Sequence, residues 1–244
     1  MKVIIAGGGT GGHIFPAVSV AEEILGRAGD NEVLFVGTKT GLENEILSKR
    51  GYRIEHITAR GMKGSGMVRS VKAVFAAITG VSESMSILKS FTPDVVLGVG
   101  GYVSGPMVLA ASLRGMPTAI CEQNAYPGIA NRILGKFVKK VCTTFDDAAA
   151  FFPGGKVVLT GNPIRRDVLA GKHGGKDPEG LTILVFGGSQ GARRLNVSVP
   201  EALSMLGRSD LSVIHLTGAK DVESVKKAYE SYGIPARVRP FIDD

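Results

Sequence analysis

The residues that the sequence lacks narrow the class of protein first. The chain contains no tryptophan and two cysteines, Cys121 and Cys142, each inside an apolar run typical of a strand. Thiols placed in this way are typical of core residues rather than of a disulfide, which favours a reducing compartment. No run approaches the roughly 20 apolar residues that span a bilayer, and no signal-peptide pattern opens the chain. We therefore expect a soluble cytosolic protein, which leaves binding to a membrane surface open.

Acidic residues are fewer than basic ones, and this limits the kinds of partner that the protein can bind. The chain has 29 lysines and arginines against 22 aspartates and glutamates, for a net charge of +7. A basic surface can meet nucleic acid, an anionic membrane or a phosphorylated substrate. No nucleic-acid-binding signature accompanies the charge, and aromatic residues are not interleaved with the basic ones. We expect no nucleic-acid partner, and because no D-x-D motif occurs we expect no metal or other cofactor.

The glycine-rich stretch 7–12 is the strongest local signal. It follows the apolar run Lys2–Ala6 and precedes apolar residues at helical spacing. A strand that turns through glycines into a helix points unpaired N–H groups and the positive end of the helix dipole at one place, where phosphate commonly binds. The alternative is a tight turn that needs positive φ. Five glycines in six residues exceed what a turn needs, which favours the phosphate site.

Two familiar uses of such a loop lack their required residues. A Walker-type loop needs Lys-Ser/Thr after its last glycine, where this chain has His13-Ile14. A dinucleotide site needs an acid at the end of the second strand. That strand, Glu32–Val36, is followed by Gly37-Thr38-Lys39. A dinucleotide-dependent oxidoreductase therefore stays only as a minor alternative.

Strand-like and helical stretches alternate as far as Thr160, which predicts a doubly wound parallel sheet. In such sheets, sites form at the carboxyl ends of the strands. A second glycine-rich junction, 98–106, contains Ser104, and the polar run 122–128 contains Asn124. These side chains are candidate sugar or phosphate ligands. The alternative for both is helix capping and turn chemistry.

A second strand and glycine loop follow a linker. The run Leu181–Phe186 and the loop 187–192 repeat the first motif in kind. We predict a first domain over 1–162, a linker over 163–180 with a glycine- and lysine-rich stretch, and a second domain over 181–244. Only three strands are expected in the second domain, half of a nucleotide-binding domain, so we expect it to be incomplete.

Taken in order, these motifs resemble the MurG family. Its members are bacterial transferases that move N-acetylglucosamine from UDP-N-acetylglucosamine onto lipid I, forming lipid II for peptidoglycan. The matching segments are Gly8–Ala17, Arg60-Gly61, Asp94–Pro106, Glu122–Asn124, Gly161–Arg165, Phe186–Arg193 and Phe241–Asp244.

The resemblance implies an α/β fold of the GT-B type, with two Rossmann-like doubly wound domains. The acceptor is then held mainly by the first domain and the donor mainly by the second. His13 matches a candidate general base. Positions that match residues binding the UDP sugar are Thr10, Gly11, Gly12, Asn124, Arg165, Ser189 and Ile242, and cleft positions are expected at Tyr102, Ser104, Glu122 and Gln190.

The implied reaction is a direct, inverting displacement at the anomeric carbon by a UDP-N-acetylglucosamine-dependent hexosyltransferase. It needs a base for the acceptor hydroxyl and positive charge or dipoles for the departing UDP. His13 stands at a helix N-terminus, where the dipole disfavours imidazolium, so a neutral imidazole could accept the proton. The alternative is that His13 only donates a hydrogen bond to a phosphate. Arg165 and the loop 187–192 suit the stabilisation of UDP.

Lipid I is membrane-bound, so the resemblance also implies an anionic membrane partner. The segment 61–91 has apolar residues beside bases, which suits a peripheral protein on the cytoplasmic face of the inner membrane. The alternative is a core-facing helical stripe, including Ile78 and Met85; we expect the start of the segment to face outward and the later helix inward. The family continues past Phe241–Asp244 into further donor contacts, so we expect this chain to be inactive alone. A non-catalytic nucleotide- or anion-binding fragment is the other alternative.

Overall fold

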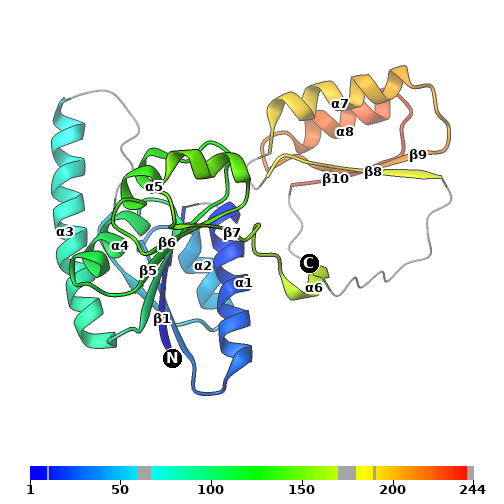
Figure 1. Ribbon diagram of the computed structural model, residues 1–244. Helices are drawn as coiled ribbons and strands as arrows, with labels where there is room; N and C mark the ends of the chain where they lie inside the picture. The colour runs from blue at the N-terminus through cyan, green and yellow to red at the C-terminus, as the bar shows by residue number, and fades with distance from the viewer. Residues whose placement is uncertain (10, 60–66, 170–179, 189–190, 241–244) are drawn as a thin grey trace. The chain divides into compact units, whose positions relative to one another are not determined.

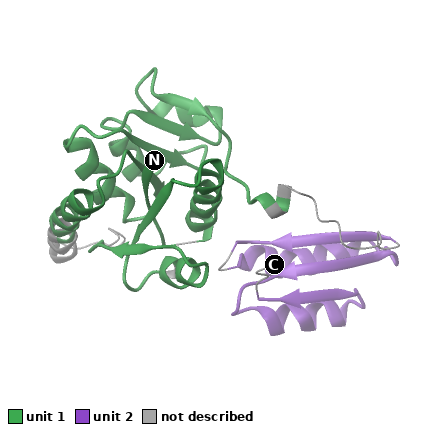
Figure 2. Ribbon diagram, turned by 90° about the horizontal axis from the view of Figure 1, so that it is seen from below, with its two compact units in different colours: residues 1–171 green, residues 172–244 purple. Residues whose placement is uncertain are grey.

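The chain forms two units, residues 1–171 and 172–244, in this computed structural model (Figure 2). The structure describes residues 1–9, 11–59, 67–169, 180–188 and 191–240. The boundary between the units falls within the expected linker, 163–180, whose own bounds stay a prediction.

Unit 1 is built on a seven-stranded sheet in which all the strand pairs are parallel (Figure 1). Its elements are β1 (Lys2–Gly7), α1 (Gly11–Arg27), β2 (Glu32–Gly37), α2 (Leu42–Lys49), β3 (Ile54–His56), α3 (Met67–Phe91), β4 (Val95–Gly100), α4 (Ser104–Leu113), β5 (Thr118–Glu122), α5 (Ile129–Leu134), β6 (Lys140–Thr143), the 3₁₀ helix η1 (Asp146–Phe151), β7 (Val157–Leu159) and α6 (Arg166–Leu169).

The strand order of this sheet is β3-β2-β1-β4-β5-β6-β7. From β1 the chain first builds the sheet outward through β2 and β3, and it then returns to add β4 on the other side of β1. The connections after β1 and after β4 therefore run toward opposite edges of the sheet. Open parallel sheets bind ligands at this switch point, outside the carboxyl ends of the strands. The sheet therefore brings the first glycine loop, after β1, beside the second, after β4. The predicted doubly wound fold of this unit is confirmed.

Hydrophobic cores lie on both faces of the sheet, which explains the nearly continuous apolar character of β1. Ile4 packs in one core with residues of α3 and α4, and Ile5 packs in the other with residues of α1. Both side chains are fully buried. Because β1 is central and covered on both faces, its ends are held firmly, and so is the start of the loop that follows it.

Unit 2 is smaller and has a three-stranded parallel sheet in the order β10-β9-β8. Its elements are β8 (Leu181–Phe186), α7 (Arg193–Met205), β9 (Leu211–Leu216), α8 (Val222–Ser231) and β10 (Ala236–Arg239). Both helices cover the same face of the sheet, as Figure 1 shows. Leu184 and Phe186 of β8 are exposed, at 56% and 62%. The three strands are those that the sequence predicts for a partial Rossmann-like domain.

The segment expected to meet a membrane is described only in part. Residues 60–66 lie outside the described residues, and the side chains described in α3 begin at Ala76. Leu88 and Phe91 are buried in the core, as expected for the inward-facing end of the helix. Ile78, expected in the core-facing stripe, is instead 62% exposed. Within the described part of the chain, no helix is long and apolar enough to cross a membrane.

Limited proteolysis tests the division into units. We expect trypsin to cut first between residues 171 and 180, because this stretch contains lysines and glycines and lies at the boundary between the two units. Mass spectrometry of the early products should show a stable fragment of about 170 residues. Early cleavage inside residues 1–160, with 171–180 protected, would contradict the predicted linker.

Candidate active site

The two glycine loops of unit 1 pack directly on each other at the switch point. Gly101 has φ +82°, and a Cβ there would overlap the carbonyl oxygen of Gly8. Gly100 has φ +104°, and its Cβ would lie 2.5 Å from Nδ1 of His13. Both positions need glycine for conformation and for space. The loops can approach this closely only because side chains are missing, and the approach fixes where the His13 ring lies.

His13 presents its two ring nitrogens differently. The residue is the third of α1 and is half-buried, while its Nδ1 atom is fully buried and has no hydrogen-bond partner among the described residues. Nδ1 faces Gly100 rather than a ligand. The ring therefore offers Nε2 for chemistry, which is the atom that a base or a phosphate ligand at this position would use.

Ser104 uses its hydroxyl inside the protein. The Oγ atom accepts a hydrogen bond from the Gly100 N–H at 3.0 Å and lies 2.7 Å from the carbonyl oxygen of Ala6. The residue is 1% exposed. It joins the end of β1 to the end of β4, so the geometry favours the turn-chemistry alternative for Ser104 over a direct role toward a ligand.

Glu122 is a buried carboxylate that organises the loop after β5. One oxygen accepts hydrogen bonds from the N–H and from Nδ2 of Asn124, both at 2.9 Å. The other accepts from the Gly128 N–H at 3.2 Å and from Nδ2 of Asn131 at 2.9 Å. Glu122 is 2% exposed, whereas Asn124 is exposed. The glutamate holds the amide of Asn124 in one orientation at the surface, which suits Asn124 as the ligand contact.

Positive charge gathers beside the first turns of α1. The guanidinium carbon of Arg165 lies 5.7 Å from the centre of the Phe15 ring, and that of Arg50 lies 5.9 Å from it. Phe15 is two residues from His13, so the contact brings Arg165 from the far end of unit 1 to the helix that carries the candidate base. A cation–π contact of this kind orients a guanidinium over the ring, and Arg50 also pairs with Glu22 at 3.9 Å.

The remaining candidates are placed less completely. Gly11 and Gly12 begin α1, and Tyr102 is 50% exposed on the second glycine loop. In unit 2, a Cβ at Gly191 would overlap the carbonyl oxygen of Thr217, so this glycine permits a close approach. Thr10, Ser189, Gln190 and Ile242 lie outside the described residues. Among the described residues, no group of three or more His, Cys, Asp or Glu could hold a metal ion.

Glu43 is the residue that the sequence reasoning missed. Its carboxylate accepts hydrogen bonds from the N–H of Gly9 at 3.0 Å, and from the N–H and Oγ1 of Thr38 at 2.8 and 2.9 Å. It is 1% exposed. Burial raises the pKa of Glu43, but the hydrogen bonds from Thr38 and Gly9 more than offset this, so its pKa lies below the ordinary value.

Glu43 also explains glycines that the sequence analysis assigned to phosphate. A Cβ at Gly8 or at Gly41 would overlap the Glu43 carboxylate, and one at Gly37 would lie 2.7 Å from its Cγ. The N–H of Gly9 is bound by this internal anion. The Gly9 N–H is therefore not available to a phosphate, whereas Glu43 makes no contact with Gly11, Gly12 or His13 among the hydrogen bonds of the described residues. The one hint in the sequence was the pair of glycines between β2 and α2, Gly37 and Gly41.

The two cysteines face each other on neighbouring strands. Cys121 of β5 is paired in register with Cys142 of β6, and both are free thiols. Their mutual hydrogen bond lowers the pKa of Cys142 to about 7 and, together with burial, raises that of Cys121. Cys142 is half-buried, so it is less enclosed than the inert core thiol that its sequence context indicates.

The chain has two α/β units, each with a parallel sheet and with a glycine loop after its first strand. These are features of the GT-B class of glycosyltransferases. Residues 3–143 match the glycosyltransferase family 28 N-terminal domain, and residues 182–244 match the glycosyltransferase family 28 C-terminal domain. The chain belongs to this family.

Its relatives include N-acetylglucosamine transferases. The UDP-N-acetylglucosamine--N-acetylmuramyl-(pentapeptide) pyrophosphoryl-undecaprenol N-acetylglucosamine transferase of Myxococcus xanthus is 50% identical; the match covers 100% of this chain and 64% of that protein. The enzyme of the same name from Syntrophus aciditrophicus is 48% identical, covering 100% and 68%. About a third of the length of these relatives has no counterpart in the 244 residues.

Solved structures agree with the fold. The crystal structure of MurG from Acinetobacter baumannii has a TM-score of 0.72 and 32% identity, and the match covers 100% of this chain and 67% of that one. A UDP-GlcNAc 2-epimerase from Neisseria meningitidis has a TM-score of 0.63 at 15% identity, covering 99% and 73%. At that identity the second comparison supports the fold alone.

Replacing Glu43 by glutamine tests its part in the loop. The amide keeps the size but brings N–H groups toward the donors of Gly9 and Thr38, so we expect the free energy of unfolding to fall by about 2 kcal/mol. The stabilisation is present above the ordinary carboxyl pKa and is lost as the pH falls through the lower folded pKa, so E43Q should also weaken the acid dependence of stability. Urea denaturation at several pH values measures both.

Glu45→Gln is the matched control on the same helix. Glu45 is exposed and pairs with Lys49 at 2.8 Å across one helical turn. Exposed pairs of this kind contribute little to stability, so E45Q should change the free energy of unfolding much less than E43Q. Equal effects of E43Q and E45Q would contradict the role assigned to Glu43.

Alkylation tests the cysteine pair. The Cys121 hydrogen bond lowers the pKa of Cys142 to about 7, so we expect iodoacetamide to modify Cys142 at pH 7 about ten-fold faster than a thiol of ordinary pKa. Peptide mapping by mass spectrometry distinguishes it from buried Cys121, which should react slowly in the native protein. Labelling of Cys142 that rises only above pH 8 would refute the lowered pKa.

Proposed function

We propose that the chain is the acceptor-binding unit and part of the donor-binding unit of an inverting N-acetylglucosaminyltransferase. The donor is UDP-N-acetylglucosamine, and the acceptor is lipid I. The observation that supports this proposal most directly is the position of His13, where the two glycine loops of unit 1 meet. Its Nδ1 atom lies against Gly100, which leaves Nε2 for a substrate. The names of the 50% and 48% identical relatives support the choice of substrates.

In the proposed reaction, an acceptor hydroxyl attacks the anomeric carbon of the donor sugar. Nε2 of His13 accepts the hydroxyl proton as the new C–O bond forms and the bond to the UDP oxygen breaks. Negative charge then develops on the departing diphosphate. Arg165 in unit 1 and the β8–α7 junction in unit 2 are the groups assigned to stabilise it. Asn124, with its amide oriented by Glu122, contacts the sugar or the phosphate.

The structure offers a physical argument against the dinucleotide alternative. The nearest acid after β2 is Glu43, and its carboxylate is buried and already bound by Gly9 and Thr38. A ribose-binding acid must present its oxygens to the ligand. Glu43 serves the loop instead, so its carboxylate is not available to a dinucleotide ribose.

The proposal includes peripheral binding at the cytoplasmic face of the inner membrane, because lipid I is anchored there. Support comes from the net charge of +7 and from the exposed Ile78 on α3, beside a segment rich in bases. The exposed apolar residue and the positive charge together suit a surface that rests on anionic lipid.

A chimera tests the function and the base together. Residues 1–244 are joined to the part of the Myxococcus xanthus relative that lies beyond the matched region, and transfer from UDP-N-acetylglucosamine to lipid I is measured in detergent. We expect activity, and we expect His13→Ala to lower the rate by a factor on the order of 10²–10⁴ with UDP-sugar binding retained.

His56→Ala is the control for that experiment. His56 is also half-buried, and Nε2 makes one hydrogen bond, to Asn44 at 3.2 Å, outside the site. It should leave the rate nearly unchanged. A chimera that binds UDP but forms no product would favour the non-catalytic alternative, and an unaltered rate in H13A would make His13 a phosphate ligand only.

A further inference from the structure

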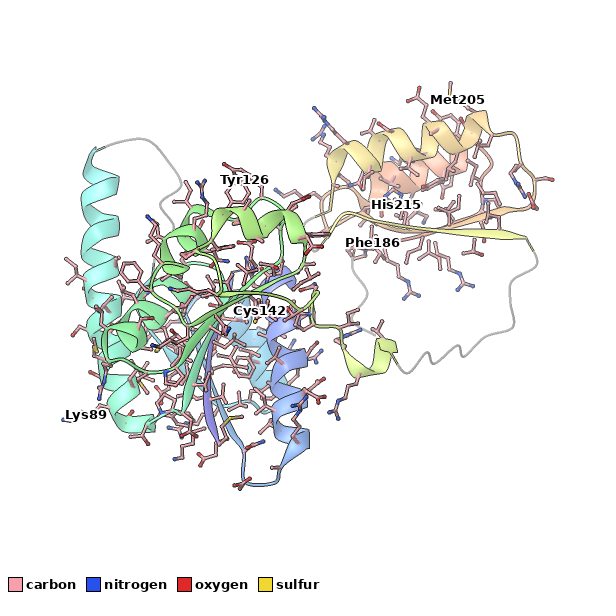
Figure 3. All side chains as sticks on the ribbon, in the orientation of Figure 1. Lys89, Tyr126, Cys142, Phe186, Met205 and His215 are labelled. Carbon is pink, nitrogen blue, oxygen red and sulfur yellow. The ribbon has the colours of Figure 1, made fainter. Side chains whose placement is uncertain are left out.

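Unit 2 contains a buried polar chain that its core does not require. His215 of β9 is 0% exposed, Tyr229 of α8 is 1% exposed, and Asn196 of α7 is 4% exposed. They come from three different elements, and the surrounding core residues are apolar, among them Val213 and Val225. Figure 3 shows His215 between the sheet and the helices of the unit. Buried polar groups destabilise a fold unless every one is hydrogen-bonded, so their partners decide what they do.

The hydrogen bonds admit one arrangement of protons. Nδ2 of Asn196 donates to the carbonyl oxygen of Thr217 at 2.9 Å and to Oδ2 of Asp221 at 2.8 Å. This orients the amide, so Oδ1 of Asn196 accepts from Nε2 of His215 at 3.1 Å. Nδ1 of His215 then has a free lone pair, and the Tyr229 hydroxyl donates to it at 3.0 Å. The hydrogen bonds are therefore all donated in one direction, from Tyr229 to His215 and from His215 to Asn196.

The charges agree with this arrangement. Burial lowers the pKa of His215 and raises the pKa of Tyr229 to about 12, so both are neutral at pH 7. Asp221, at the N-cap position of α8, is the charged group at the end of the chain, and Asn196 separates it from the imidazole. A protonated His215 could no longer accept the Tyr229 hydrogen, so the neutral Nε2–H tautomer is the one that the network requires.

The Asn196 end of this hydrogen-bond network lies at the carboxyl ends of the strands. Thr217 follows β9, and its carbonyl oxygen binds Asn196 and is also the atom that a Cβ at Gly191 would overlap. Gly191 has φ +73° and comes just before α7. One carbonyl is thus held between the start of α7 and the junction that precedes it. Displacing the Asn196 amide would remove the hydrogen bond from α7 to this carbonyl, against which the backbone of Gly191 packs.

We propose that Asn196, oriented by His215 and Tyr229, is a positioning residue that sets the spacing between the start of α7 and the β9–α8 loop, and so shapes the diphosphate-binding end of unit 2. The ligand class rests on the proposed function. The positioning itself rests only on the contacts within unit 2, so the two can fail separately.

The test uses the 244-residue chain and variants that separate positioning from core packing. His215→Gln can keep both hydrogen bonds, with its amide N–H toward Asn196 and its oxygen toward Tyr229. His215→Leu removes both and keeps an apolar core. Tyr229→Phe removes only the distal bond and is matched by Tyr232→Phe, at a position 46% exposed.

Three measurements are made on each chain: the ¹⁵N shifts of the His215 imidazole, amide hydrogen exchange, and binding of UDP and of inorganic pyrophosphate by calorimetry. We expect the Nε2–H tautomer in the wild type. We expect H215L to speed exchange at Gly191 and Gly218 at least ten-fold and to weaken UDP binding at least ten-fold. H215Q should restore both to within three-fold of wild type, and Y232F should change neither.

The outcomes separate the hypotheses. An Nδ1–H tautomer, or a uniform rise in exchange over unit 2 that H215Q does not reverse, would overturn the positioning role. If wild type binds neither UDP nor pyrophosphate while exchange at Gly191 and Gly218 follows the expected order, the positioning stands and the proposed donor site in this chain fails. If H215L does not fold, Y229F takes its place. It leaves the Nε2–H bond to Asn196 but removes the hydrogen bond to Nδ1, so we expect the ¹⁵N shift of Nδ1 to change and exchange at Gly191 to rise. An unchanged spectrum and exchange would refute the proposal.

Discussion

The contact between the Glu43 carboxylate and the first glycine loop is the interaction on which the candidate site depends. A charge buried without a cation is tolerated because three hydrogen-bond donors, from Gly9 and Thr38, converge on it. The loop is thereby tied to the end of β2. The second loop then packs on it through Gly101, and His13 is set between them. The positions of the second glycine loop and of the His13 ring therefore depend on the position of the first loop.

Buried anions in unit 1 are satisfied by N–H groups rather than by basic side chains. Glu43 binds two backbone N–H groups and a hydroxyl, and Glu122 binds two backbone N–H groups and two amide nitrogens. Within the described residues, neither forms an ion pair. The interior therefore does not consume the positive charge of a chain that carries +7. That charge remains near the surface, where an anionic substrate or lipid can meet it.

The two units hold their glycine junctions by different chemistry. Unit 1 uses a carboxylate, whose hydrogen bonds are strong and weaken only when acid protonates it. In unit 2 the neutral side chains of His215 and Asn196 hold the Thr217 carbonyl, and the Asn196 amide also binds Asp221. In both, a residue remote in sequence fixes a loop that local propensity alone leaves undetermined.

The sequence by itself determined the alternation of strands and helices, the two units, the two glycine loops of unit 1, and the placing of His13 at the start of a helix. These follow from local periodicity and from short motifs, which neighbouring residues encode. The roles of Glu43 and Ser104 were decided by the tertiary structure. Glu43 lies 34 residues from its partner Gly9, and Ser104 lies 98 residues from Ala6. Neither hydrogen bond could therefore be predicted from the spacing of residues along the sequence. Only the parallel sheet, by bringing the ends of distant strands to one edge, turns a glutamate on one helix into the anion that a glycine loop closes around.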